Sequence, residues 1–254
     1  MTTPKVETIK RSGSRFYVDP SSGAKAPGVT SILNMLPKEF LKFWAAKVVA
    51  ETAVDQAGAW LQMALNGDRQ GAVDYLKRAP MRDTDGAAKR GTEAHEIFEK
   101  LSLGEEVGRV HPDMAWAVKH YNAFLDRFQP EFIYLEATVW NDDPLYAGSF
   151  DALAVIEGET VILDNKTTRS GVHAEVALQF TAYAAAESLI DPDGARTPMP
   201  AADAGAVVHV VPDGWKLVPV SIERELLMPV FEGLCRVHEW DKELKKRVIG
   251  KEIS

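Results

Sequence analysis

Two aspartates and a lysine in the middle of the chain could together bind a divalent cation. Asp164 and Lys166 end the apolar run Val161–Leu163, and Asp151 stands thirteen residues before Asp164. Two carboxylates about 5 Å apart repel by roughly 3 kcal/mol at an effective dielectric constant near 20. A lysine compensates part of this repulsion, and Mg²⁺ or Mn²⁺ compensates more. The pattern predicts a cation site, with an Asp–Lys salt bridge at an exposed sheet edge as the alternative.

The register of the predicted strands decides which charged groups meet. The apolar runs on either side of Glu157–Gly158 are typical of a β-hairpin. If these two residues form the loop, Asp151 lies opposite Asp164; if the loop is Gly158–Glu159, Asp151 lies opposite Lys166. In both registers the three side chains share one face of the sheet. Only a loop of odd length would separate them.

A third acid, Glu136, stands on the preceding predicted strand. It falls on the same face if the loop between Trp140 and Tyr146 has an even length. A surface glutamate on a half-exposed strand is the equal alternative. Glu243–Lys245 repeats the acid-x-lysine pattern, but in a charge-rich predicted helix, which favours a solvated face.

The elements around these residues predict an α/β layered domain. The first 130 residues are mainly helical, after a short hairpin that turns at Asp19–Gly23. Thr30 is the expected cap of the first helix. The helices are expected at Glu39–Leu65, Asp68–Lys77, Asp85–Leu103, Pro112–Phe128, Val172–Leu189 and Glu223–Val248, and the strands at Phe132–Trp140, Tyr146–Ile156, Thr160–Lys166, Ala206–Pro212 and Trp215–Ile222.

Composition excludes several classes of protein. The chain has 254 residues, a net charge of −8 and a single cysteine, Cys235. The acidic balance disfavours a passive DNA coat more than a DNA-processing enzyme. One cysteine excludes a four-cysteine zinc or iron–sulfur site, and Cys235 is expected as a small buried hydrophobe. Without a signal segment or an apolar run of membrane length, we expect a cytoplasmic protein that binds no membrane.

Five segments, in order, resemble motifs of the PD-(D/E)XK nuclease superfamily, most closely RecB-type exonucleases and their stand-alone bacteriophage relatives. The resemblance covers residues 27–187. Its segments are Val29–Leu33 with Phe43–Lys47, Gly91–His95 for the helical G-T-x-x-H motif, Glu136 with Gly148–Asp151, Ile162–Thr167 for D-x-K-T, and Gln179–Tyr183 for Q-x-x-x-Y.

The resemblance implies a restriction-endonuclease-like core, a central mixed sheet flanked by helices, with an N-terminal helical region. It implies one domain over residues 1–254, with residues 1–130 mainly helical and 131–254 carrying the sheet. The implied metal ligands are His95, Asp151, Asp164 and the Asn165 carbonyl, the implied catalytic residues add Lys166 and Glu136, and the implied nucleic-acid contacts are Gln179, Tyr183 and Arg169.

In these roles Lys166 would orient the attacking water and stabilise the transition state, and Glu99 could orient His95. Each residue has a structural alternative: a surface histidine at position 95, helix packing for Gln179 and Tyr183, and a solvated charge for Arg169, as for Lys89 and Arg90. Trp44, Trp60 and Phe43 are expected in the core.

The implied activity is Mg²⁺- or Mn²⁺-dependent hydrolysis of DNA by an exonuclease, with one or two ions, in replication, recombination or repair. The alternatives are a structure-specific endonuclease and a non-catalytic DNA-binding or partner-recruiting protein. The absence of a G-x-x-x-x-G-K-[ST] loop predicts no nucleotide cofactor, and the lone cysteine predicts no iron–sulfur cluster. The expected partners are DNA and either a second copy of the chain or a recombination or replication protein; a phage-encoded chain would act in the host cytoplasm.

Overall fold

The computed structural model describes residues 6–250, which divide into two compact units. Residues 6–36 and 93–250 form the sheet unit, and residues 37–92 form the helical unit. Helix α5 (Ala79–Ser102) contributes its first part to the helical unit and its second part to the sheet unit. The region expected to be mainly helical, residues 1–130, is therefore shared between both units.

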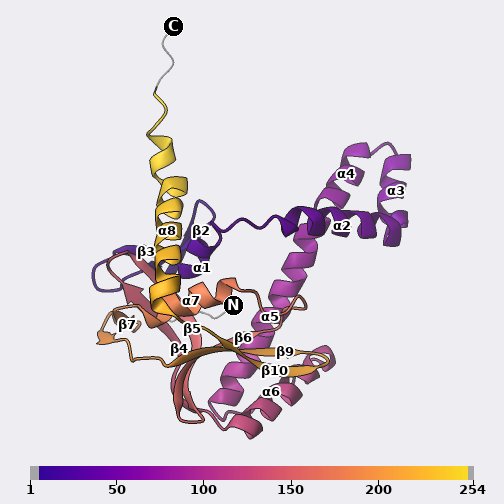
Figure 1. Ribbon diagram of the computed structural model, residues 1–254. Coiled ribbons are helices and arrows are strands. Elements are labelled where there is room, and N and C mark those ends of the chain that lie inside the picture. Colours follow the sequence, from indigo (N-terminus) through magenta and orange to yellow (C-terminus); the bar gives the residue numbers. More distant parts are fainter. Residues whose placement is uncertain (1–5, 251–254) are drawn as a thin grey trace. The chain divides into compact units, whose positions relative to one another are not determined.

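A mixed seven-stranded sheet is the centre of the sheet unit (Figure 1). Its order is β10-β9-β6-β5-β4-β7-β8. Neighbours β6 and β9 are parallel, and all other neighbouring strands are antiparallel. The strands are β4 (Glu131–Asn141), β5 (Tyr146–Ile156), β6 (Glu159–Lys166), β7 (Ser188–Ile190), β8 (Arg196–Pro198), β9 (Ala204–Val211) and β10 (Gly214–Val220).

The β5–β6 hairpin adopts the first of the two registers considered. Ile156 pairs with Glu159, so Glu157–Gly158 is the loop. Both loop residues have positive φ angles, 50° and 90°, as a type I′ turn requires to match the twist of its strands. Continued one position past its last pair, this register sets Asp151 opposite Asp164.

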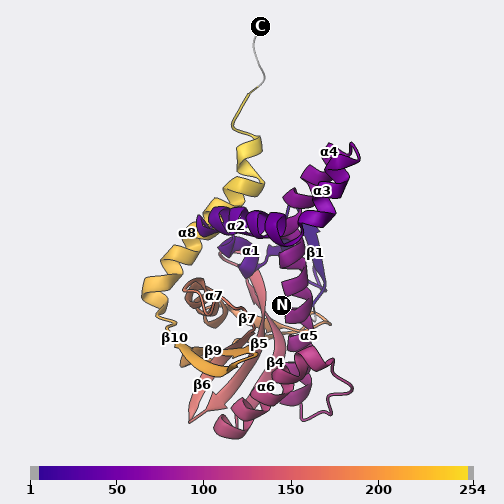
Figure 2. The same ribbon diagram turned by 90° about the vertical axis from the view of Figure 1, so that its right-hand side faces the viewer.

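Helices cover both faces of this sheet (Figures 1 and 2). On one face lie α1 (Val29–Leu33), α7 (Glu175–Ala184) and α8 (Arg224–Lys242), which share a buried apolar cluster with the sheet. On the other lie the second part of α5, the 3₁₀ turn η1 (Pro112–Met114) and α6 (Ala115–Phe128). Strands β5, β6 and β9 contribute residues to both clusters, so they are buried on both faces.

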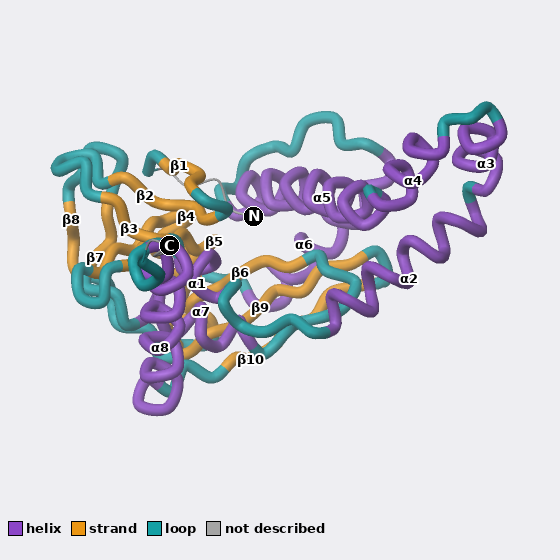
Figure 3. The backbone as a smooth tube through the Cα atoms, turned by 90° about the horizontal axis from the view of Figure 1, so that it is seen from above, coloured by secondary structure: helices purple, strands orange, loops and turns teal. Residues whose placement is uncertain are grey.

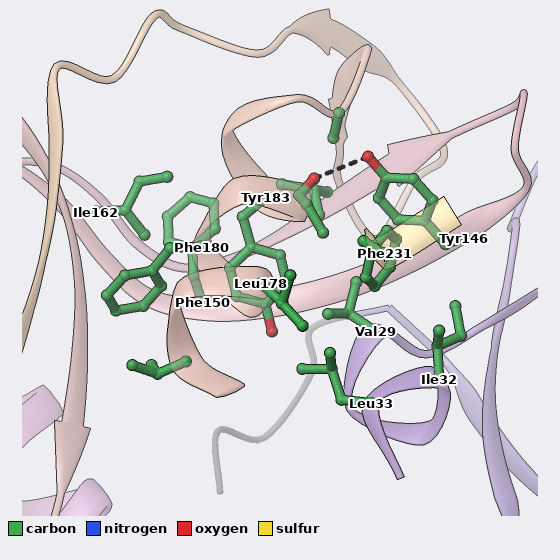
Figure 4. Packing of buried hydrophobic residues seen from close by; sticks show 14 of the residues in the cluster. Val29, Ile32, Leu33, Tyr146, Phe150, Ile162, Leu178, Phe180, Tyr183 and Phe231 are labelled. Atoms are coloured by element: carbon green, nitrogen blue, oxygen red, sulfur yellow. Dashed lines mark hydrogen bonds between the residues drawn. The ribbon is translucent and has the colours of Figure 1, made fainter. Parts of the chain in front are cut away.

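Figure 4 shows the close packing of buried residues in the α7 layer. This packing depends on a glycine of the sheet. A Cβ at Gly205 would lie 2.4 Å from Cδ2 of Phe180, so only glycine lets that ring rest on β9. On the same side, the Tyr146 hydroxyl donates to the Ala182 carbonyl at 2.8 Å, which satisfies a buried polar group. These contacts fix α7 over the centre of the sheet.

A small antiparallel sheet precedes the helices. It consists of β1 (Thr8–Arg11), β2 (Ser14–Val18) and β3 (Lys25–Pro27), in that order. The turn between β2 and β3 falls at the expected Asp19–Gly23, where Asp19 Oδ1 accepts from the Ser21 amide and hydroxyl. Strand β1 was not predicted from the sequence.

The helical unit consists of α2 (Phe40–Asp55), α3 (Ala57–Leu65), α4 (Arg69–Lys77) and the first part of α5 (Figure 3). The expectation of a single amphipathic helix over Glu39–Leu65 was wrong, because the chain breaks at Gln56 and α2 and α3 bury no residue completely. Phe43, expected in the core, is 77% exposed. No helix among residues 6–250 is both long enough and apolar enough to cross a membrane.

Three other expected boundaries were wrong. The helix expected to run to Leu189 ends at Ala184, because Leu189 pairs with Val139 of β4 as part of β7. The last helix ends at Lys242 and is followed by the 3₁₀ turn η2 (Leu244–Lys246). The cap of α1 is Gly28, with no side-chain cap hydrogen bond, so Thr30 does not have the expected role.

Candidate active site at the ends of β5 and β6

Asp151 is buried where the pairing between β5 and β6 stops, and only 2% of it is exposed. The Asn165 amide of β6 donates to Asp151 Oδ2 at 2.6 Å. His95 Nδ1, from α5, lies 3.3 Å from the same oxygen. Asp151 thus connects the β5–β6 hairpin with the helix on the second face of the sheet.

Asp164 is equally buried, at 3% exposure, and has a different set of neighbours. Its Oδ2 lies 2.6 Å from Lys166 Nζ. Its Oδ1 accepts a long hydrogen bond, 3.4 Å, from Gln179 Nε2 of α7. The same Gln179 nitrogen donates to the Tyr183 hydroxyl at 3.1 Å, so the two α7 residues predicted to face the site do so.

The two aspartates and the lysine influence one another electrostatically. Burial raises the pKa of Asp164 above its ordinary value, and the charge of Asp151 raises it further, although Lys166 acts in the opposite direction. Burial by itself would lower the pKa of Lys166, but Asp164 and Asp151 outweigh it and the pKa is raised. One ammonium group therefore leaves Asp164 incompletely compensated.

Glu136 lies on β4 opposite Asp151. Ala137 pairs with Phe150 and Leu135 with Ala152, and the loop from β4 to β5, between the paired Asn141 and Tyr146, has an even length. Glu136 is buried, and its φ of 52° lies in the left-handed region, where a residue other than glycine pays about 1–3 kcal/mol. The strand turns over here: Ala137 packs against the α7-side cluster and Leu135 against the α6-side cluster.

Gly148 explains how α7 comes so near to the acids. A Cβ at this position would lie 2.4 Å from Tyr183 Cε1 and 3.2 Å from Val29 Cγ2. Glycine therefore lets the Tyr183 ring lie directly against β5. Figure 4 shows Tyr183 among the buried residues of the α7-side cluster. The glycine of the Gly148–Asp151 segment is needed for packing beside the acids.

Aromatic and hydroxyl groups on α5 and α6 support His95. Phe98, one turn after His95, stacks on Tyr121 with ring centroids 4.4 Å apart. The buried Tyr121 hydroxyl is 2.8 Å from Ser102 Oγ, and the Asn165 side chain is near enough to lower the pKa of Tyr121 against the larger raising effect of burial. Tyr121 thus links the helices on this face to the end of β6.

A cavity of about 40 Å³ lies beside these residues. That volume holds a few water molecules, or a cation with one or two oxygen ligands. Its lining combines two cationic groups, one carboxylate and several hydroxyl and amide groups. The lining residues are Arg15, Tyr17, Val29, Thr30, His95, Gly148, Ser149, Asp164, Lys166, Gln179 and Tyr183.

The donor atoms suit a hard divalent cation. Carboxylate oxygens with one imidazole are a ligand set of Mg²⁺ or Mn²⁺, and Asp164 is incompletely compensated by Lys166. The buried Asn165 Oδ1 also has no hydrogen-bond partner among the described residues. No group of three or more His, Cys, Asp or Glu side chains that could hold a metal ion is found among residues 6–250.

Some predicted residues are not among those that line this cavity. Arg169 is exposed in the loop after β6, and Lys89 and Arg90 are exposed on α5 in the helical unit. Within the described chain no hydrogen bond joins Glu99 to His95, whose ring lies beside Asp151 instead. The second acid-x-lysine tripeptide, Glu243–Lys245, lies where α8 ends and η2 begins, and it is mostly exposed.

Sequence reasoning missed two residues that line the cavity, Arg15 and Tyr17 of β2. Arg15 is half-buried, and no acidic side chain in residues 6–250 forms an ion pair with it. Both residues stand in a polar hairpin that carries no motif. The only signal in the sequence is that an arginine and a tyrosine stand two positions apart on one predicted strand, and so on one face of it.

The arrangement brings together the chemical groups for water activation near an anion: two buried carboxylates, an ammonium, an imidazole and an unpaired guanidinium. Four elements supply the residues that meet here: α5 supplies His95, β5 supplies Asp151, β6 supplies Asp164 and Lys166, and α7 supplies Gln179 and Tyr183.

In comparisons with known proteins, no family model matches the chain and no curated protein matches it significantly.

Proposed function

We propose that the chain is a nuclease that hydrolyses DNA phosphodiester bonds with Mg²⁺ or Mn²⁺, on a restriction-endonuclease-like core. The observation that carries this proposal is the pair of buried aspartates, with Lys166 2.6 Å from Asp164 and His95 3.3 Å from Asp151, beside a small polar cavity. Burying two carboxylates is costly without compensating charge. A divalent cation offsets that cost, and the motifs that resemble PD-(D/E)XK nucleases fall on these same residues.

The charges around the cavity favour an anionic substrate. Lys166 and Arg15 both line it, and Arg15 has no acidic partner among the described residues. A phosphodiester oxygen can accept hydrogen bonds from both groups, and arginine presents a planar fork that matches phosphate geometry. The whole chain is acidic, so such local cations are what would attract DNA.

His95, Asp151, Asp164 and the Asn165 carbonyl are the groups that would hold the ion. When bound, the ion would activate water and neutralise the charge that develops on the phosphate. Lys166 would hold the attacking water in line and donate to the developing negative charge. Gln179 would fix the orientation of Asp164 through its hydrogen bond, and Tyr183 would fix Gln179.

The test is a cleavage assay with the full chain on end-labelled single- and double-stranded DNA, with Mg²⁺, Mn²⁺ or excess EDTA. Asp164→Asn keeps the side-chain shape and removes the charge, and Asp193→Asn is the matched control at an exposed aspartate. We expect metal-dependent cleavage by the wild type and by Asp193→Asn, and none by Asp164→Asn.

Equal cleavage by the wild type and Asp164→Asn would assign the activity to a contaminant and reject the proposal. Retained DNA binding without cleavage by any form, in either metal, would favour a non-catalytic DNA-binding protein. Labels at both ends separate the two modes of cutting: single nucleotides released from an end identify the exonuclease that the resemblance implies, and internal fragments identify an endonuclease.

A further inference from the structure

Helix α8 has two apolar sides, and only one of them is covered by the protein. Its inner side carries Met228, Phe231 and His238, which are buried. Phe231 and Met228 belong to the α7-side cluster, and His238 Nε2 lies 3.0 Å from Ser14 Oγ of β2. The inner side therefore explains how α8 is attached to the sheet unit (Figure 1).

The outer side carries an exposed stripe that continues into η2. Leu226 is 64% exposed, Val237 47% and Trp240 48%. At 100° per residue the members that lie within α8, Leu226 to Trp240, fall within a sector of about 80°, opposite the buried side. The stripe consists of Leu226, Val230, Gly233, Val237, Trp240 and Leu244.

The spacing of the stripe is that of a coiled coil. Successive members are separated by alternating steps of four and three residues, which is the heptad pattern that keeps one seam facing a partner helix. In this pattern Val230, Val237 and Leu244 occupy one core position, and Leu226, Gly233 and Trp240 the other. Gly233 has open space where a Cβ would stand, so a second helix can approach closely there.

The charges beside the seam select the partner. Arg236 and Asp241 occupy the flanking positions that meet across a parallel pair of helices, five residues apart. Arg236 is exposed and has no ion pair within residues 6–250. Asp241 contacts Lys242 and Lys245, and its side chain stays 33% exposed. Two copies related by a two-fold axis along α8 would form the Arg236–Asp241 pair twice.

We propose that the outer stripe of α8 is the interface of a homodimer, in which two copies of α8 pack in parallel. A two-fold interface requires a surface that fits itself, and this stripe does so in both its apolar spacing and its flanking charges. The proposal is independent of the proposed nuclease activity.

The test is the mass of the full chain by sedimentation over a wide range of concentrations. We expect twice the 28.0 kDa of one chain at high concentration. Val237→Glu would place two facing carboxylates in the seam and raise the dissociation constant at least about 100-fold. Val54→Glu, at an exposed valine of α2, is the matched control and should not change it. Circular dichroism should show a folded chain in each case, because both valines are exposed.

A charge exchange tests the parallel arrangement. Arg236→Asp and Asp241→Arg should each weaken the dimer, and the double variant should restore it. The proposal is wrong if the wild type stays monomeric at every concentration. It is also wrong if Val237→Glu dimerises as well as the wild type. If Val237→Glu disrupts the dimer but the double charge exchange does not recover the wild-type dissociation constant, the parallel pairing of Arg236 with Asp241 is wrong.

Discussion

Two buried carboxylates of the sheet unit, Asp19 and Asp164, show opposite electrostatic behaviour. Each is 3% exposed and each contacts a cationic side chain. The pKa of Asp164 is raised by burial. Burial acts in the same direction on Asp19, but the hydrogen bonds from Ser21, Ser22 and Arg196 outweigh it and the pKa lies well below its ordinary value.

The number and quality of hydrogen bonds explain the difference. Asp19 Oδ1 accepts from the Ser21 amide at 2.8 Å and the Ser21 hydroxyl at 2.7 Å, and its Oδ2 accepts from Arg196 at 2.9 Å. Asp164 has Lys166 at 2.6 Å and only the 3.4 Å bond from Gln179. Asp19 closes a turn and is fully compensated. Asp164 faces a cavity beside another carboxylate, and the fold leaves it in need of positive charge.

The largest expected difference between the two places is in catalysis. Lys166→Met should lower the cleavage rate at least about 100-fold, because it removes the cation that would stabilise the transition state. Arg196→Met, the matched change at Asp19, should leave the rate within a few-fold of wild type. Initial rates at saturating DNA and metal measure both. A comparable loss in both variants would mean that the two cations have the same structural role.

The second difference is in stability. Asp19→Asn should lower the free energy of unfolding by about 1–3 kcal/mol, because it weakens three charge-assisted hydrogen bonds. Asp164→Asn should lower it less, because the loss of the ion pair with Lys166 is offset in part by relief from the repulsion of Asp151. Urea denaturation measures both values. If Asp164→Asn unfolds as readily as Asp19→Asn, the contrast between the two carboxylates is wrong.

The pH dependence sharpens the same contrast. Because the pKa of Asp19 is lowered in the fold, its stabilising contribution is fully present above the ordinary value of about 3.9. It is lost as the pH falls below that value towards the pKa of the folded state. The stability gap between the wild type and Asp19→Asn should therefore narrow from pH 6 to pH 2, as followed by thermal melts. With Asp193→Asn, an exposed control, the gap should be small throughout.

The longer strands of the large sheet, β4, β5, β6, β9 and β10, and the site hairpin could be predicted because their signals are local. The apolar runs around Glu157–Gly158 predicted the hairpin but left two registers open. The structure adopts the one with Glu157–Gly158 as the loop, which sets Asp151 opposite Asp164 one position past the last pair. The place of Glu136 stayed open between the site face and a half-exposed surface, and it is the structure that shows the even loop length. Its left-handed backbone could not be predicted, since no sequence pattern signals a strand that turns over. The metal dependence and the nuclease activity stay predictions.

The rest depends on contacts between distant segments. Arg15 reaches the cavity from a hairpin far from the acids in sequence, and Asp19 meets Arg196 only because β8 folds back beside the β2–β3 turn. The apolar positions of α2 predicted a buried helix, yet Phe43 is exposed. Hydrophobic spacing shows that a face is apolar, and only the tertiary structure shows whether anything covers it.

The smallest expected effect is the response of thermal stability to metal. An ion that binds the folded chain stabilises it by about 1.4 kcal/mol when its concentration is ten times the dissociation constant, which is about 3–6 °C for a chain of this size. Mg²⁺ or Mn²⁺ should raise the melting temperature of the wild type and of Asp19→Asn equally, and EDTA should reverse the rise. Asp164→Asn should not respond, because it lacks the carboxylate that the ion would compensate. An equal shift in all three proteins would mean that the ion binds elsewhere. It would then not be the charge that compensates Asp164.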